Sequence, residues 1–344
     1  MNREILSRTL DPRPLSPRTA TAIFDTLLAP TSTEVDRAAL LVALASRALT
    51  ARELAEFARE MQRRAVAFPL PAGDRPIDLC GSGGARTPSF NVSTVSAFVV
   101  AAARTPVVKH GNRSSRGLCG SSDLLEALGL PVVESLRFSR ATYRRWRLAF
   151  LHAPLYHPAA RAVAAVRRAV GIPTLFNQLG PLTNPAKISY QLVGVPDLAT
   201  AERAARVLGN LGRRRAMAVT SVEGCDEFSP QRHTIAVIWN RGRVSHKTVV
   251  ASEFLPSEDR RGSWGALLPP AAAYEARRIL AGGGGARRGS VLLTAGAALW
   301  VAEAAPTVAE GVERARQALD SGRAEALLND MVRMAPTYRS AGRG

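Results

Sequence analysis

Hydrophobic residues in the N-terminal part of the chain recur at the spacing of helices. The apolar stripe 23–28 follows Ser16, which stands as an N-cap residue ahead of a proline. Thr50 and Glu53 form the pattern of a capping box, and the apolar positions of 54–61 share one helical face behind it. The first seventy residues therefore predict a small all-helical unit.

The hydrophobic pattern changes after segment 68–76, which we interpret as a linker because four of its nine residues are proline or glycine. Beyond it, short apolar runs alternate with glycine-containing turns and helical patterns, as in a largely parallel sheet with helical crossovers. Strands are predicted at 77–80, 107–108, 190–195 and 215–221, helices at 94–103, 123–128, 159–170 and after Pro269, and a hairpin at 234–239 and 244–249. The predicted fold class is α/β, with a small N-terminal all-helical domain and a larger domain that has a mostly parallel central sheet and flanking helices.

The composition is that of a folded protein of two packed units. Of its 344 residues, 46% are hydrophobic and 22% are charged. No continuous apolar run opens the chain, and none elsewhere approaches the roughly 18 residues that cross a bilayer. Cys80, Cys119 and Cys225 are odd in number and far apart, so they indicate neither a disulfide framework nor a zinc site. We expect a cytoplasmic protein that does not associate with membranes.

The charge of the chain leaves two interpretations open. Its formal net charge is +18, and all but three of its 46 basic residues are arginine. A strongly basic protein can attract phosphorylated small molecules to a site, or it can bind nucleic acid. Because net charge governs association and not fold, it does not choose between them.

Two glycine-containing segments are candidates for binding phosphate. Gly81 to Gly84 follow a predicted strand, and 91–94, Asn-Val-Ser-Thr, open a predicted helix. Such a turn lets backbone N–H groups approach an anion, although a tight strand-to-helix connection would also explain the glycines. Segment 109–113, Lys-His-Gly-Asn-Arg, ends the next strand, and its lysine suits a phosphate unless the segment is only a solvated loop.

Two further groups of charged residues are candidates for substrate and metal binding. Arg167 follows His157 by ten residues on one predicted helix, which can carry its guanidinium to the same cleft to pair with a carboxylate. Asp226 and Glu227 lie in a loop after a predicted strand and have the oxygen ligands that Mg²⁺ prefers. Taken alone, each of these residues could equally be a solvated surface group.

Read in order, these segments resemble the anthranilate phosphoribosyltransferase family over nearly the whole chain. The most specific stretches are FNVSTVSAFVVAAA at 90–103, KHGNR at 109–113, GSSDLLEALG at 120–129 and FNQLGPLTNP at 176–185. The resemblance implies a fold like that of nucleoside phosphorylases. It also implies transfer of a phosphoribosyl group from 5-phosphoribosyl pyrophosphate to the amine of anthranilate, a step of tryptophan biosynthesis that uses Mg²⁺.

The resemblance also implies roles for individual residues. It implies that 5-phosphoribosyl pyrophosphate contacts Gly81, Gly84, Ser89, Asn91, Ser93, Thr94, Lys109 and Ser121. It implies that anthranilate contacts Gly81, His110, Asn112, His157 and Arg167, and that Ser93, Asp226 and Glu227 hold Mg²⁺. Positioning by Lys109 and Arg167 is expected to matter more than any general base, because the aromatic amine attacks in its neutral form.

The chain departs from the family pattern in the segments that bind the donor. Ala85 stands where the family usually has Asp, Arg86 where it has Gly, and 116–119 replace a serine-rich loop. Two interpretations follow: Arg116 and Arg86 compensate as phosphate ligands, or the donor site is weakened.

The family's architecture predicts how the chain divides. Residues 1–70, joined by helices from about 155–182, would form a domain that also forms a homodimer, and 76–344 would form the domain that binds 5-phosphoribosyl pyrophosphate.

Two alternatives to the anthranilate reaction stay open. Leu151 and His152 near the acceptor route fit transfer to a related aromatic amine, and the +18 charge with the altered donor segments fits a degenerate paralogue that binds nucleic acid.

Overall fold

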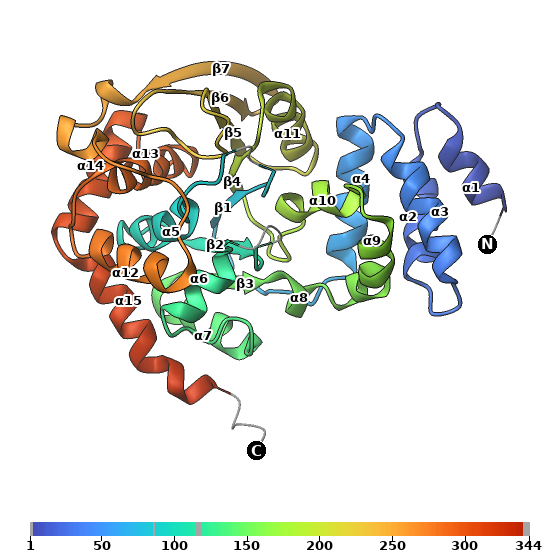
Figure 1. Cartoon of the computed structure of the whole chain (residues 1–344), viewed down its shortest axis with the longest axis horizontal. Helices are drawn as coiled ribbons and strands as arrows, with labels where there is room; N and C mark the ends of the chain where they lie inside the picture. Colours follow the sequence, from blue (N-terminus) through green and yellow to red (C-terminus); the bar gives the residue numbers. More distant parts are fainter. Residues whose placement is uncertain (1–2, 85–86, 115–117, 340–344) are drawn as a thin grey trace.

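A helical unit at the N-terminal end of the chain stands beside a larger α/β body (Figure 1). The structure, a computed structural model, describes residues 3–84, 87–114 and 118–339. The N-terminal unit contains α1 (Arg3–Leu10), α2 (Pro17–Leu28), α3 (Glu34–Ala45) and α4 (Ala51–Arg63). Two of these helices begin at the predicted residues: the Ser16 hydroxyl accepts from the Thr19 N–H, and Thr50 and Glu53 form a capping box.

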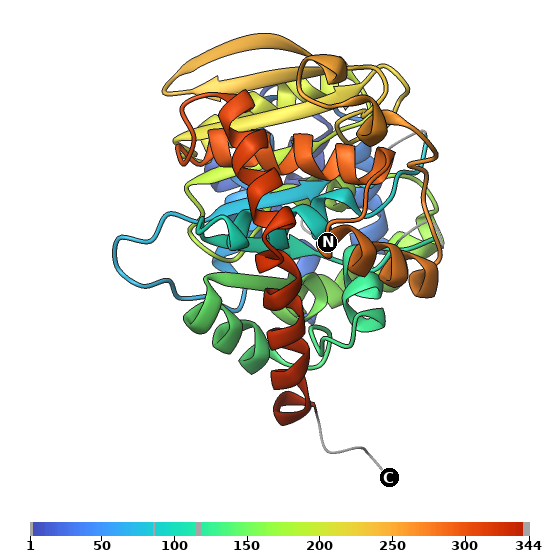
Figure 2. The ribbon, with the colours of Figure 1, turned by 90° about the vertical axis from the view of Figure 1, so that its left-hand side faces the viewer.

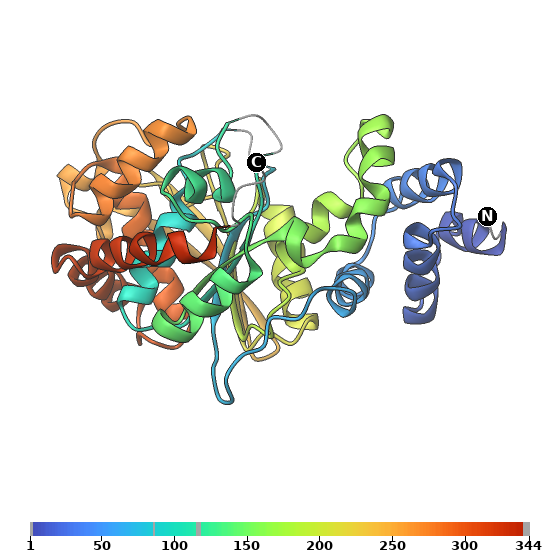
Figure 3. The same cartoon turned by 90° about the horizontal axis from the view of Figure 1, so that it is seen from below.

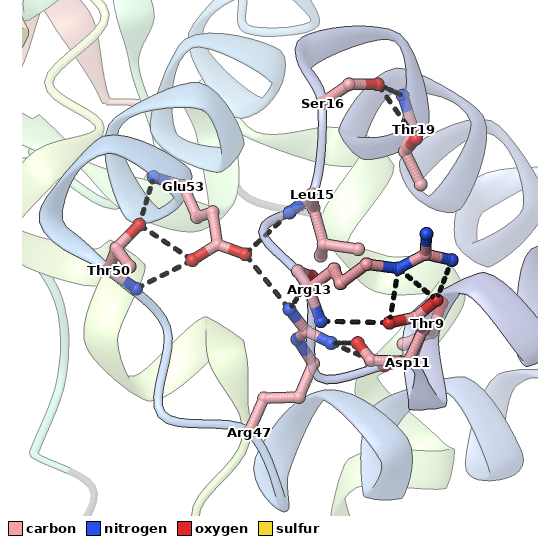
Figure 4. Close-up of polar contacts among 9 residues, drawn as sticks. All are labelled: Thr9, Asp11, Arg13, Leu15, Ser16, Thr19, Arg47, Thr50 and Glu53. Carbon is pink, nitrogen blue, oxygen red and sulfur yellow. Dashed lines mark hydrogen bonds and ion pairs between the residues drawn. The ribbon is translucent and has the colours of Figure 1, made fainter.

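A buried ion pair holds the connections of the N-terminal helices together (Figure 4). The Glu53 carboxylate accepts hydrogen bonds from the backbone N–H groups of Leu15 and Thr50 at 2.9 and 2.8 Å, and from Arg47 at 3.1 Å. Arg47 also donates to the carbonyl oxygens of Thr9 and Arg13. Burial by itself would raise the pKa of Glu53. The hydrogen bonds that its carboxylate accepts have the larger combined effect, so the pKa of Glu53 lies below its ordinary value.

The central sheet of the larger body has seven strands in the order β3-β2-β1-β4-β5-β6-β7. The strands are β1 (Ile77–Gly81), β2 (Val107–Gly111), β3 (Leu148–His152), β4 (Tyr190–Gly194), β5 (Arg215–Ser221), β6 (His233–Asn240) and β7 (Arg243–Val250). Strands β1 to β5 pair in parallel, and β6 and β7 add an antiparallel hairpin at one edge. The predicted mostly parallel sheet and the predicted hairpin are therefore confirmed.

Helices cover both faces of the sheet (Figures 1, 2 and 3). The main apolar core lies against α5 (Val92–Ala102), α6 (Ser121–Ala127), α12 (Pro269–Leu280), α13 (Ala286–Val301), α14 (Val308–Asp320) and α15 (Arg323–Met334). A second core on the other face joins α11 (Leu198–Asn210), α9 (Ala164–Val170) and α10 (Leu175–Leu179) to α2, α3 and α4. The two cores alternate along β1, because Leu79 belongs to the first and Cys80 to the second.

Helices α7 (Leu136–Trp146) and α11 were not predicted, and further differences concern β3 and the helix predicted at 159–170. The apolar run Leu148–His152, for which no strand was predicted, forms β3, which follows α7 in the chain. The helix predicted at 159–170 is divided: a 3-10 helix, η1 (Pro158–Val163), follows the short α8 (Ala153–Tyr156), and α9 completes the segment before Gly171, whose φ is +68°. Among the described residues, no helix is long and apolar enough to cross a bilayer.

Candidate active site

The candidate site lies at the carboxyl ends of the parallel strands. The sheet order reverses at β1, whose neighbours β2 and β4 lead to opposite edges. Open α/β sheets bind ligands in the crevice at such a reversal, outside the carboxyl ends of the strands. Gly81 ends β1, Lys109 and His110 lie near the end of β2, and the loop that follows β5 carries the acidic pair.

Two glycines allow the acidic pair to approach the strand ends. A Cβ atom at Gly81 would lie 2.8 Å from Asp226 Oδ2, and one at Gly194 would overlap the Asp226 carbonyl oxygen. A side chain at Gly194 would displace the backbone of the loop that carries Asp226, and one at Gly81 would displace the Asp226 carboxylate. The structure therefore brings together the glycine turn after β1 and the acidic pair, which are far apart in the sequence.

A chain of hydrogen bonds joins the first turn of α5 to the acidic pair and to β2. The backbone N–H of Ser93 donates to Glu227 Oε1 at 3.1 Å, and Lys109 Nζ donates to Ser93 Oγ at 3.2 Å and to the Leu79 carbonyl oxygen. Ser93, Lys109, Asp226 and Glu227 are all buried. Three predicted site segments thus meet in one buried polar cluster.

The charges of this cluster fit a divalent cation. Burial, and then the adjacent Asp226 carboxylate, raise the pKa of Glu227, and the Lys109 ammonium opposes them. When both carboxylates are ionised, their two negative charges exceed the single positive charge of the Lys109 ammonium, so the cluster can accept further positive charge. In the part of the chain that the structure describes, no three His, Cys, Asp or Glu side chains gather as a metal site. A cation here would therefore depend on the two carboxylates, the Ser93 hydroxyl and substrate oxygens.

Hydrogen bonds also connect the remaining predicted donor residues. Asn91 Nδ2 donates to the Cys119 carbonyl oxygen at 2.8 Å, and Ser121 Oγ donates to the Asn112 carbonyl oxygen at 3.1 Å. Gly84 precedes residues that are not described, Ser89 pairs with Gly265 in an isolated antiparallel bridge, and Thr94 is buried in the first turn of α5. The predicted phosphate ligand Arg116 lies outside the described residues.

Two neutral histidines lie on the helical-domain side of β2. The rings of His110 and His157 are 5.1 Å apart between their centroids and meet edge to face. Burial lowers the pKa of His110 to about 3, with the neighbouring His157 adding to the effect, and burial lowers the pKa of His157 to about 4. Both rings are therefore uncharged at neutral pH and can line a passage for a planar aromatic molecule.

Arg167 is half-buried beside the segment 176–185. Its guanidinium lies 5.3 Å from the centre of the Phe176 ring and donates to Asn177 Oδ1 at 3.3 Å. Burial lowers its pKa from the ordinary arginine value. These contacts come from a neutral ring and a neutral amide, so the positive charge of Arg167 is available to a carboxylate ligand.

A buried polar network behind β1 and β2 was missed by the sequence analysis. Asp78 Oδ1 accepts from the His110 N–H at 3.1 Å, and Asn184 Nδ2 donates to the Val108 carbonyl oxygen at 2.8 Å. Arg213 Nε donates to Gln191 Oε1 at 3.2 Å. Burial raises the pKa of Asp78 to about 6. An aspartate inside the apolar run 77–80 was the available signal, since buried charges are normally paired.

Comparison with known proteins identifies relatives over nearly the whole chain. Residues 73–325 match the family described as glycosyl transferase family, a/b domain, and residues 3–65 match the one described as glycosyl transferase family, helical bundle domain. The anthranilate phosphoribosyltransferase of Herpetosiphon aurantiacus is 36% identical over 320 residues, which cover 92% of this chain and 94% of the relative. That of Methylobacterium radiotolerans is 38% identical over 330 residues, 94% of each chain.

Solved structures agree with these sequence relationships. The crystal structure of anthranilate phosphoribosyltransferase from Thermus thermophilus has a TM-score of 0.85 at 34% identity, covering 96% of this chain and 99% of that one. The Saccharomyces cerevisiae enzyme in complex with 5-phosphoribosyl pyrophosphate and Mg has a TM-score of 0.82 at 24% identity, covering 98% and 99%. This second likeness is one of fold alone.

Proposed function

Because the chain belongs to the anthranilate phosphoribosyltransferase family, we propose that it transfers the phosphoribosyl group of 5-phosphoribosyl pyrophosphate to the amine of anthranilate and releases pyrophosphate. The observation that carries the proposal for its own residues is the buried cluster of Ser93, Lys109, Asp226 and Glu227. It places cationic, hydroxyl and carboxylate groups at the carboxyl ends of the strands, where a phosphorylated donor would bind.

The donor is proposed to bind between the turn after β1 and the start of α5. Backbone N–H groups of the turn after Gly81 would contact phosphate oxygens, together with Lys109 and Ser121. Ser93, Asp226 and Glu227 would hold Mg²⁺. When bound, Mg²⁺ supplies positive charge that stabilises the departing pyrophosphate.

The acceptor is proposed to approach past His110 and His157. Their neutral rings can pack against the anthranilate ring without attracting its carboxylate away from Arg167. Arg167 would pair with that carboxylate and, together with Asn112, would orient the amine towards the ribose.

The reaction requires no strong base from the protein. The bond from ribose C1′ to the pyrophosphate oxygen breaks, the nitrogen of the neutral amine bonds to C1′, and the amine then loses one proton to the released pyrophosphate or to water. The electron pair of the broken bond leaves with pyrophosphate, beside the positive charge of Lys109. Positioning of two substrates supplies much of the remaining rate.

We also propose that the chain is a cytoplasmic homodimer that associates through its helical domain, formed by 1–70 with segments from about 155–182. Val35 and Val42 on α3 support this, since they are 75% and 45% exposed on a helix whose leucines are buried. Sedimentation equilibrium would test the dimer, and a monomer at micromolar concentration would contradict it.

The experiment that tests the proposed function is release of pyrophosphate in the presence of both substrates and Mg²⁺. We expect release to depend on anthranilate and to fall steeply in Glu227→Gln. Release that is equally fast without anthranilate, or with aniline in its place, would contradict the proposed acceptor.

A further inference from the structure

A segment far along the chain lies against the donor loop, residues 87–91. Segment 262–266 precedes α12 and pairs with this loop through backbone groups: the Phe90 N–H donates to the Trp264 carbonyl oxygen at 3.1 Å, and the Ala266 N–H donates to the Pro88 carbonyl oxygen at 3.2 Å. Ser89 and Gly265 form an antiparallel bridge between the two. Segment 262–266 therefore supplies two of the backbone hydrogen bonds of the donor loop.

The side chain of Trp264 connects the same segment to the acidic loop. Trp264 is 8% exposed and forms a small apolar cluster with Cys225 and Ala286, separate from the main cores. Cys225 directly precedes Asp226 in the chain. The Trp264 indole thus packs against the loop that carries the carboxylates, while the backbone carbonyl oxygen of Trp264 accepts a hydrogen bond from the donor loop.

Further hydrogen bonds fix both ends of this arrangement. Gln231 Nε2 donates to the Gly262 carbonyl oxygen at 2.8 Å, and Arg287 donates to the Gly265 carbonyl oxygen at 3.2 Å. On the other side, Thr87 Oγ1 donates to the Glu223 carbonyl oxygen at 3.1 Å. The donor loop, segment 262–266 and the acidic loop together surround a cavity of about 290 Å³.

From these contacts we propose that Trp264 is a positioning residue for the donor: it fixes the donor loop and the acidic loop relative to each other, without touching either substrate. The proposal rests on the proposed function, because it assigns Trp264 to the binding of 5-phosphoribosyl pyrophosphate with Mg²⁺. A loop that is held in its bound conformation loses less entropy when the ligand binds, so binding is tighter.

The expected effect is specific for the donor. Removal of the indole in Trp264→Ala takes away the packing against the acidic loop, while the backbone hydrogen bonds to the donor loop remain. The two loops are then no longer fixed relative to each other, and we expect the dissociation constant and the KM for 5-phosphoribosyl pyrophosphate to rise about tenfold or more. The KM for anthranilate should change less than about twofold, because His110, His157 and Arg167 lie in other segments. Trp264→Phe, which keeps an aromatic ring in the cluster, should recover most of the affinity for the donor.

The experiment measures binding of 5-phosphoribosyl pyrophosphate with Mg²⁺ by calorimetry without an acceptor, followed by the two KM values. Trp146→Ala is the matched control, because Trp146 is a partly buried tryptophan on α7, outside these contacts. A second pair, Ala266→Pro and Ala266→Ser, removes or keeps the N–H that donates to Pro88. It tests the other half of the arrangement, the pairing of segment 262–266 with the donor loop, and does so even if Trp264→Ala does not fold.

The outcomes separate this inference from the proposed function. Donor affinity that falls in Trp264→Ala and Ala266→Pro but not in Trp146→Ala or Ala266→Ser would support the inference. Unchanged donor affinity in both test variants, or equal rises of both KM values, would overturn it. Wild-type protein that binds the donor but consumes no anthranilate would overturn the proposed function alone, and wild-type protein that binds no donor would overturn both.

Discussion

Replacement of Lys109 by methionine tests the buried cluster most sharply. Methionine keeps an unbranched apolar side chain but removes the ammonium, which donates to Ser93 Oγ at 3.2 Å and to the Leu79 carbonyl oxygen. A hydrogen bond to a charged group contributes about 1.5–3 kcal/mol. Loss of one such bond to a donor phosphate therefore predicts a KM for 5-phosphoribosyl pyrophosphate that is about 10 to 150 times higher.

The loss of charge also changes the neighbouring carboxylates. Lys109 lowers the pKa of both Glu227 and Asp78, so both values should rise further in Lys109→Met. These groups can then take up protons instead of remaining as unpaired buried charges, which limits the loss of folding stability. The main effect should therefore be on donor binding.

The assay is initial loss of anthranilate fluorescence with each substrate varied in turn at saturating Mg²⁺. Lys247→Met is the matched control, since Lys247 is an exposed lysine on edge strand β7. We expect the control to behave as wild type and Lys109→Met to lose donor affinity with little change in the KM for anthranilate. An unchanged KM for the donor, or equal rises of both KM values, would refute the role assigned to Lys109.

Three further predictions concern the acceptor and the stability of the fold. Arg167→Ala should raise the KM for anthranilate about tenfold or more, the size of one lost charged hydrogen bond, and leave donor binding unchanged; the reverse split would contradict its role. Because burial lowers the pKa of His110 and His157, the unfolded chain takes up protons first as the pH falls below 6.5. Their contribution to the free energy of unfolding is therefore fully present above that pH and declines towards pH 4, by about 3 kcal/mol for His157. Urea unfolding measured against pH should show a shallower decline for His157→Asn than for wild type. An equally steep decline in both proteins would be evidence against buried neutral rings. Glu53→Gln breaks the buried pair with Arg47 and should cost about 3 kcal/mol in urea unfolding, whereas the exposed control Glu4→Gln should cost almost nothing.

The sequence predicted those parts of the fold that are specified locally. Ser16 and the Thr50–Glu53 pair mark helix starts because their side chains bond to backbone groups within three residues. Strand β5 and the hairpin follow from apolar runs bounded by turn residues. Strand β3 was missed because no glycine separates it from the arginine-rich helix α7. The left-handed position between them is occupied by Arg147, which does not mark a turn in the sequence. Its assignment depends on pairing with β2, which local pattern does not specify.

The site was predictable to the same extent and for the same reason. Lys109, Ser93 and Glu227 each stand beside a recognisable segment, and the parallel sheet brings the strand ends together. Trp264 stands in no recognisable segment, and Asp78 interrupts the predicted strand 77–80 without indicating its partners. Their significance comes from contacts with residues more than 25 positions away, such as His110 for Asp78 and Phe90 for Trp264, which only the folded chain reveals.

The central claim is that this chain consumes anthranilate by transferring a phosphoribosyl group to it. The most direct measurement is anthranilate fluorescence after purified protein is mixed with 5-phosphoribosyl pyrophosphate and Mg²⁺. We expect a steady loss of fluorescence that releases one pyrophosphate for each anthranilate consumed and stops when the metal is chelated. Constant fluorescence in the presence of bound donor would contradict it.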